Sequence, residues 1–133
     1  MTEPLTGGCL CGAVRYELAG EPINVRICHC RNCQRALSGP FFARALYHRA
    51  DVTITGETAA YLITPILARV WCPKCGVRLF AERQETPGRI GVALASLDDP
   101  NALKPECHFF TASRLDWVIL GDGLPQFPEW PPD

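Results

Sequence analysis

The 133-residue sequence has little net charge and no long apolar run, and each absence excludes a class of protein. Its formal net charge is -1, which argues against a broad electrostatic surface for nucleic acid or for an acidic membrane. No stretch approaches the ~18 apolar residues that a membrane-spanning helix needs. Residues 1–8 have neither a basic start nor an apolar segment, unlike a secretory signal. We therefore expect a cytoplasmic protein without nucleic-acid or membrane partners.

The composition is that of a folded chain, with 47% hydrophobic and 20% charged residues. The length suits one domain and the sequence contains no linker or repeat, so residues 1–133 are predicted to form a single domain of undetermined oligomeric state. A chain of this size buries enough apolar surface to fold without disulfides. The tail 125–133 is too rich in proline for sheet or helix, and we expect it to be loose or to lie as an extended cover.

Alternation of apolar and polar residues predicts β-strands along most of the chain. Val14, Tyr16 and Leu18, for example, alternate with charged residues. Further candidate strands are 23–27, 41–48, 51–55, 59–64, 66–71, 77–83, 89–95 and 115–120. Helix is expected only over two turns at 31–37 and one turn at 99–103. The predicted class is mainly β, because many short strands with frequent turns favour folded-over or barrel-like antiparallel sheets.

Eight cysteines stand out against this ordinary background, and seven of them fall into three clusters. The clusters are CLC (Cys9 and Cys11), CHCRNC (Cys28, Cys30 and Cys33) and CPKC (Cys72 and Cys75). Disulfides are rare in a reducing cytoplasm, so we interpret the clusters as metal ligands. Cys107 stands alone and is predicted to be a buried, small apolar group.

The spacing of two clusters suits a closed zinc site. Tetrahedral zinc with Zn–S bonds of ~2.3 Å needs sulfurs roughly 3.7 Å apart. A tight turn with Pro73 and Gly76 would bring the CPKC sulfurs together, and an extended CLC segment would direct both of its sulfurs to one face. Linking the two pairs across about 60 residues costs on the order of 4 kcal/mol of chain entropy. Structural zinc contributes ~10–16 kcal/mol, so the sequence predicts a structural site on Cys9, Cys11, Cys72 and Cys75.

The CHCRNC cluster then has three thiols and no evident fourth ligand. Three protein ligands with one open position is the pattern of catalytic zinc. An ion held by Cys28, Cys30 and Cys33 would accept water or an external thiol and lower the pKa of whatever it binds. Arg31 and Arg35 flank the cluster, and together with Arg44 they are candidate contacts for the carboxylates of a bound thiol cofactor.

Other interpretations of this cluster remain. His108 or Cys107 could close it, which would make it a second structural site in a non-catalytic zinc-binding interaction module. His29 is a weaker candidate, because it would point away from its neighbours in an extended segment. Oxidation of zinc-held thiolates would instead make the cluster a redox sensor.

The motifs also resemble a known family. GGCLCGAVRY, CHCRNCQRALSG, VWCPKCGVRLF, IGVALASLDDP and PECHFFTASRLDW, spread from Gly7 to Trp117, are similar in order to blocks of the glutathione-dependent formaldehyde-activating enzymes, to which centromere protein V is related. The resemblance implies a mostly β, zinc-dependent fold akin to methionine sulfoxide reductase B. It also implies a structural zinc and a catalytic zinc on the two cysteine sets described above.

The resemblance further implies the chemistry. In the named enzyme, the sulfur of glutathione approaches the second zinc and adds to formaldehyde to give S-hydroxymethylglutathione. The expected function is therefore that of a carbon–sulfur lyase with two zinc ions, acting on a small thiol such as glutathione and on formaldehyde or a related carbonyl compound. The matching motifs contain the candidate metal ligands and residues of the fold. The resemblance therefore predicts zinc binding more directly than it predicts the substrate.

Overall fold

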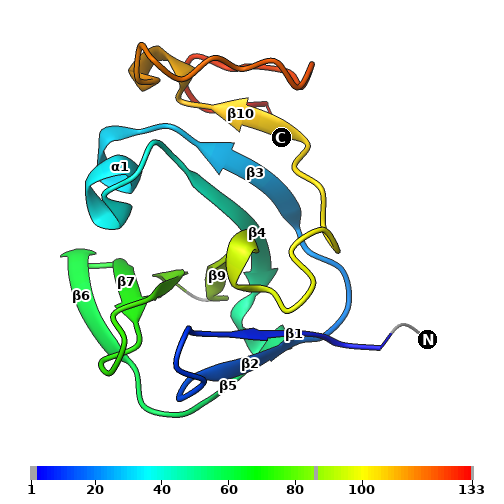
Figure 1. Cartoon of the computed structure of the whole chain (residues 1–133), viewed down its shortest axis with the longest axis vertical. Coiled ribbons are helices and arrows are strands. Elements are labelled where there is room, and N and C mark those ends of the chain that lie inside the picture. The colour runs from blue at the N-terminus through cyan, green and yellow to red at the C-terminus, as the bar shows by residue number, and fades with distance from the viewer. Residues whose placement is uncertain (1–2, 86, 133) are drawn as a thin grey trace.

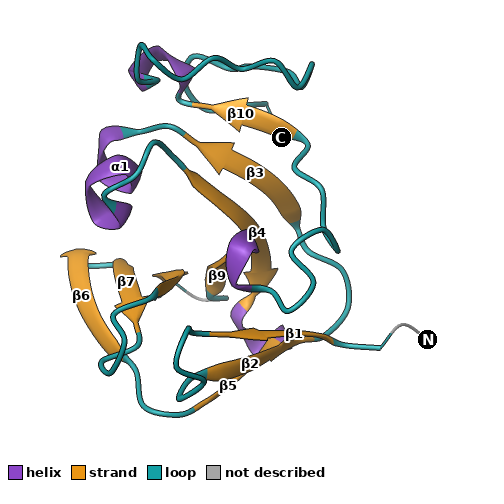
Figure 2. Ribbon diagram, viewed as in Figure 1, coloured by secondary structure: helices purple, strands orange, loops and turns teal. Residues whose placement is uncertain are grey.

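Two β-sheets, a short helix and several 3-10 turns make up the computed structural model, which describes residues 3–85 and 87–132 (Figures 1 and 2). The small sheet has the strand order β1-β2-β5, and the large sheet has the order β10-β3-β4-β9-β8-β7-β6. All neighbours are antiparallel except β10 and β3, which run parallel. The mainly β prediction is confirmed, although the large sheet is mixed. No helix in the described residues is long and apolar enough to cross a bilayer.

The element bounds follow the predicted alternation closely. The elements are β1 (Leu5–Gly8), β2 (Arg15–Leu18), β3 (Asn24–Cys28), α1 (Arg31–Leu37), β4 (Phe42–His48), η1 (Arg49–Asp51), β5 (Val52–Thr55), β6 (Ala59–Thr64), β7 (Leu67–Trp71), β8 (Arg78–Arg83), β9 (Arg89–Ala93), η2 (Leu94–Ser96), β10 (Cys107–Phe109) and η3 (Thr111–Ser113). The helix at 31–37 is confirmed, whereas β1 and β10 were not predicted.

Two predicted elements are wrong. The segment 115–120 is not a strand, and its Trp117 and Ile119 project into solvent with exposed fractions of 71% and 82%. An apolar alternation without a neighbouring strand has no backbone partners, so it does not form a strand. The segment 99–103 forms turns rather than a helix, with Ala102 N donating to the carbonyl oxygen of Asp99.

Strand register gives the large sheet two different faces. Ala45 of β4 pairs with Val25 on one side and Val92 on the other, and the row continues through Phe80 to Val70. This row is buried against the small sheet, whose Val14, Tyr16, Leu18 and Val52 complete one core. Because strand side chains alternate, the residues between these positions must lie on the opposite face.

That opposite face carries several arginines among small and apolar residues. Arg44 pairs with Arg26 of β3 and with Ala93 of β9. Two positions further along the strands, the next row in register consists of Leu46, Gly91, Ala81 and Arg69. Pairing of like-charged neighbours such as Arg26 and Arg44 is unfavourable without a compensating anion. The register therefore concentrates positive charge on this face, although Arg26 also has the carboxylate of Glu106 as a partner.

The proline-rich tail covers one edge of the large sheet. Phe127 N donates to the carbonyl oxygen of His108 at 2.9 Å, and His108 N donates to that of Pro125 at 2.9 Å. Phe110 N bonds the carbonyl oxygen of Glu129 at 3.0 Å. Of the two predicted states of the tail, the described part therefore adopts the extended cover.

Gly7 offers a test of how tightly β1 packs against Tyr16 of the same sheet and Ser96 of η2. A Cβ at this position of β1 would lie 2.3 Å from the Tyr16 hydroxyl oxygen and 2.5 Å from the Ser96 carbonyl oxygen. The Tyr16 hydroxyl is held by Ser96 Oγ at 2.6 Å, so the ring cannot easily move aside. We expect Gly7→Ala to lower the free energy of unfolding by about 1–3 kcal/mol through overpacking, measured by urea denaturation.

Gly121→Ala is the matched control, since no heavy atom lies within 4 Å of its Cβ position. It should change the free energy of unfolding by less than about 0.5 kcal/mol. Equal effects of the two substitutions on the free energy of unfolding would contradict the prediction that a Cβ at Gly7 overpacks the contact with Tyr16.

Candidate metal centres

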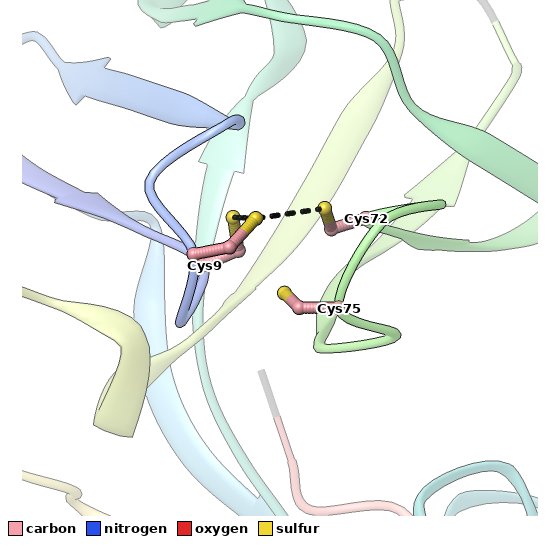
Figure 3. Close-up of side chains that lie close together, drawn as sticks. Cys9, Cys72 and Cys75 are labelled. Carbon is pink, nitrogen blue, oxygen red and sulfur yellow. Dashed lines mark hydrogen bonds between the residues drawn. The ribbon is translucent and has the colours of Figure 1, made fainter.

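Four cysteine sulfurs converge from two distant turns. The Sγ atoms of Cys9, Cys11, Cys72 and Cys75 all lie within 4.8 Å of one another. Cys9 Sγ is 3.6 Å from Cys11 Sγ, which is 3.8 Å from Cys72 Sγ. Tetrahedral zinc with ~2.3 Å bonds requires nearly this separation. Figure 3 shows Cys9 on one chain segment facing Cys72 and Cys75 on another.

Each pair of sulfurs is presented by a turn. Between β7 and β8, Gly76 takes φ 78° and donates its N–H to the Cys72 carbonyl oxygen at 2.8 Å, as the CPKCG spacing predicts. The expectation of an extended CLC segment is wrong, since Gly12 at φ 79° donates to the Cys9 carbonyl oxygen at 3.3 Å. The chain must reverse here because β1 and β2 are antiparallel neighbours.

The surroundings of this four-cysteine cluster lower the pKa of Cys9 and Cys75, whereas at Cys11 the Ala13 N–H is outweighed by burial and the neighbouring thiols, which raise the pKa of Cys11 to about 11. Burial opposes ionisation of Cys9, but the Val14 N–H, 3.3 Å from its sulfur, and the neighbouring thiols lower its pKa to about 6. The backbone N–H of Val77 likewise lowers the pKa of Cys75. Four sulfurs within 4.8 Å of one another, three of them accepting backbone hydrogen bonds, fit a sulfur-preferring divalent ion such as zinc.

The second group lies where β3 passes into α1. Cys28 ends β3, Cys30 caps the helix and Cys33 lies in its first turn, with the three Sγ atoms within 4.8 Å of one another. Cys33 N donates to Cys30 Sγ at 3.4 Å. This capping bond explains why the CHCRNC spacing brings three sulfurs together, because it sets the helix start at Cys30.

The three thiols cannot all ionise by themselves. The Cys28 thiol hydrogen-bonds to Cys30, which holds the pKa of Cys28 well above its usual range. The same contact, with help from Cys33, lowers the pKa of Cys30 to about 2. A divalent cation removes this conflict by stabilising all three thiolates, so the donor set fits a second ion.

No further His, Cys, Asp or Glu in the described part of the chain joins this triple group. His108 is held elsewhere, since its Nδ1 bonds His29 Nε2 at 2.9 Å and its Nε2 bonds Asp122 Oδ2 at 2.7 Å. Cys107 is buried outside both groups, as predicted for a small apolar side chain. Neither candidate fourth ligand therefore reaches the cluster.

The triple cluster borders a cavity of about 560 Å³ on the arginine-bearing face of the large sheet. Besides the three cysteines, the lining includes five arginines (Arg26, Arg44, Arg69, Arg83 and Arg89), four aromatic residues (Phe42, Phe109, Phe110 and Trp130) and no Asp or Glu in the described residues. Two small residues, Gly91 and Ala81, are part of its lining. A larger side chain at Gly91 would enter the cavity, since even a Cβ there would lie 3.0 Å from Arg44 Cδ. The cavity thus combines sulfur at one side with positive charge around it.

Three of the cavity arginines already have carboxylate partners. Arg26 Nε lies 3.1 Å from Glu106, while Arg83 and Arg89 share Glu85 at 2.8 Å and 3.5 Å. These pairs are at least partly exposed, so they contribute little stability. They reduce the positive potential of the cavity without removing it.

Arg44 has no carboxylate partner in the described structure. It donates to Asn24 Oδ1 and lies over the Phe109 ring at 5.3 Å from the centroid. Burial lowers the pKa of Arg44 to about 10, because the cation loses hydration. An anionic group of a ligand would offset that loss.

Of the arginines predicted to contact a cofactor, only Arg44 lines the cavity. Arg31 donates to Gln34 Oε1 and Arg35 is exposed on α1. The other cavity arginines were missed: Arg69, Arg83 and Arg89 come from β7, β8 and β9, far from the triple cluster in sequence, and Arg26 of β3 was not singled out although it lies two residues from Cys28. Their place on the polar side of alternating strands was the available signal.

The tail and the C-terminal end of β10 form an aromatic wall of the cavity. Trp130 stacks on Phe109 at a centroid distance of 5.6 Å and meets Phe110 edge-on at 5.0 Å. Phe110 itself has φ 54°, an uncommon conformation for a bulky residue. Strained residues of this kind gather at binding sites, where the surrounding structure holds them in place.

Comparison with known proteins gives consistent results. Residues 4–113 match the family model described as glutathione-dependent formaldehyde-activating enzyme. A Halomonas elongata protein with the provisional name of a glutathione-dependent formaldehyde-activating enzyme is 26% identical over 126 residues, covering 87% of this chain and 80% of its own. A crystal structure of a Rhodobacter sphaeroides protein is similar with a TM-score of 0.59 at 26% identity, covering 73% of this chain and 91% of that chain.

Substitution of single cysteines separates metal binding from packing. Cys72 and Cys107 are both buried, with exposed fractions of 0% and 4%, but only Cys72 belongs to a cluster. We expect Cys72→Ala to lose one zinc per chain, measured by elemental analysis, and to lose several kcal/mol of unfolding free energy because the two turns are no longer joined.

Cys107→Ala should keep the metal content of the wild type and cost only on the order of 1 kcal/mol, the loss of one buried atom. If both variants retained the same metal content, the four-cysteine cluster would not be a metal centre.

Proposed function

The chain belongs to the glutathione-dependent formaldehyde-activating enzyme family, and on that premise we propose that it is a zinc-dependent enzyme that adds a small thiol to formaldehyde or a related carbonyl compound. The observation that carries this proposal is the three-thiol cluster at the wall of a positively charged cavity. In the forward direction the thiol loses its proton, its sulfur bonds the carbonyl carbon, and the carbonyl oxygen gains a proton. The reverse direction breaks that bond, which is a carbon–sulfur lyase reaction.

Each cysteine group has its own role in the proposal. Cys9, Cys11, Cys72 and Cys75 would hold a structural zinc, whereas Cys28, Cys30 and Cys33 would hold a second ion with one open position. Bound zinc supplies a Lewis acid that lowers the pKa of a coordinated thiol. The lack of a fourth protein ligand for the triple cluster within the described residues supports this role.

Charge balance supports glutathione as the thiol. The five cavity arginines and their partners Glu85 and Glu106 leave a formal charge of +3, and three thiolates with a divalent ion reduce it by one to +2. Glutathione with an ionised sulfur carries a thiolate, two carboxylates and one ammonium group, or -2. A ligand of this charge would neutralise the cavity, and Arg44 is the candidate contact for one of its carboxylates.

The size and walls of the cavity support a small-molecule substrate. Its volume of about 560 Å³ lies within the range of ~300–1,000 Å³ that is typical of ligand pockets. Trp130 and Phe110 would cover the bound thiol and exclude water, while arginines would fix its orientation. We further propose that residues 1–133 work as one domain in the cytoplasm, where such thiols stay reduced.

Nuclear magnetic resonance exchange spectroscopy tests the reaction directly. Zinc-loaded protein should accelerate exchange between hydrated ¹³C-formaldehyde and S-hydroxymethylglutathione above the rate in buffer. Protein with two bound zinc ions but no acceleration would overturn this choice of substrates. A cobalt-substituted sample titrated with glutathione adds an independent measurement, since an open second site changes its cobalt–thiolate bands and a closed interaction module does not.

Arg44→Met tests the carboxylate contact. Removing a charge-assisted hydrogen bond of about 1.5–3 kcal/mol should weaken glutathione binding at least tenfold, measured by calorimetry on the zinc-loaded protein. The binding of 2-mercaptoethanol, which has no carboxylate, should be unchanged in the same variant. An equal loss for both thiols would mean that the substitution damages the cavity rather than a carboxylate contact.

A further inference from the structure

Arg69 of β7 is a buried cation beside the triple cluster. Its exposed fraction is 6%, and its guanidinium lies 5.4 Å from the centroid of the Phe42 ring. One nitrogen, Nη2, donates to Cys33 Sγ at 3.3 Å and to Asn32 Oδ1 at 2.7 Å. Arg69 therefore connects β7, the strand next to the edge strand β6 of the large sheet, directly to a sulfur of the proposed second centre.

Arg69 lowers the stability of the fold when its role in packing is considered alone. No carboxylate pairs with it in the described residues, and its buried Nε has no hydrogen-bond partner there. Both features oppose stability, since a buried charge and an unsatisfied N–H lose their hydration. An apolar side chain of similar length would fill the same space at lower cost. Within the described residues, the group placed to offset the charge of Arg69 is the sulfur of Cys33, once a bound ion makes it a thiolate.

We propose that Arg69 is a positioning residue for the second metal centre. Its N–H···S bond holds Cys33 Sγ toward Cys28 and Cys30 and withdraws electron density from that sulfur, which makes a bound ion a stronger Lewis acid. Groups that hydrogen-bond to metal ligands tune metal centres in this way. The inference rests on the proposed second ion, but not on the identity of the thiol or the carbonyl compound.

A merely structural arginine would behave differently on substitution. If Arg69 served only to tie β7 to α1, its loss would lower the stability of the fold and leave the bonding at the ion unchanged. If it positions Cys33, its replacement by methionine should leave the fold intact, while the ion is held less tightly and its bonding changes. The two roles are therefore separated by measuring both properties in the same variants.

The experiment uses the full chain expressed in cobalt-supplemented, zinc-depleted medium. Cobalt release to excess chelator is followed by absorbance for the wild type, Arg69→Met, Arg69→Lys and Arg78→Met. Arg78 is the matched control, because it is exposed, contacts Trp71 and does not line the cavity. Urea denaturation of each loaded protein reports the stability of the fold.

The wild type should release two cobalt equivalents in two phases. In Arg69→Met we expect one phase to accelerate at least tenfold and the thiolate-to-cobalt band to move to longer wavelength, because Cys33 becomes a stronger electron donor. Arg69→Lys keeps a charge near the sulfur and should show a smaller acceleration. Arg78→Met should match the wild type in both measurements.

Unchanged release and an unchanged band in a folded Arg69→Met protein would overturn the inference while leaving the second centre in place. If Arg69→Met did not fold, a wild-type release rate in Arg69→Lys would overturn it equally. A wild-type protein that binds a single cobalt equivalent would instead refute the second centre, and with it the proposed function.

Discussion

The repulsion between crowded thiolates is the constraint on which this structure depends. Seven sulfurs lie in two groups so tight that they cannot all ionise without a divalent cation in each. In the four-cysteine cluster, one pair comes from the β1–β2 turn of the small sheet and the other from the β7–β8 turn of the large sheet. An ion there would join the two sheets beside the core formed by Tyr16 and its neighbours. The stacking of the sheets in turn fixes which face of the large sheet remains free to form the cavity.

Strand β7 links the two cysteine clusters along the chain. It carries Arg69, which contacts Cys33, and it leads directly into Cys72 of the other cluster. Its register with β8 is irregular between Val70 and Trp71, where the strand turns toward the closed site. Arg69 and Cys72 are therefore only three residues apart in the chain, although one lines the cavity and the other lies in the core.

Local patterns explain why much of the fold was predictable and the cavity was not. Turn chemistry and alternation are properties of neighbouring residues, so the CPKCG turn, the helix at 31–37 and most strands followed from sequence. Strand β10 was missed because three residues have too little pattern, and it forms only by pairing with β3. Arg31 and Arg35 were chosen for their closeness to Cys30 in sequence. The arginines that line the cavity are brought there by strand pairing, which sequence alone does not determine.

The residues matched by the family model do not include every residue that lines the cavity, and this difference bears on the choice of substrate. Residues 4–113 include both cysteine clusters and all five cavity arginines, so the metal chemistry and the anion-binding character lie inside the matched region. Trp130 and Pro131 lie outside it, yet they line the same cavity through contacts of the tail with Phe109 and Phe110. The wall that would cover a bound thiol thus combines Phe109 and Phe110 of the matched region with Trp130 beyond it. Reactivity at sulfur can then be common to relatives while the shape of the accepted thiol differs, because the two depend on separate segments of the chain.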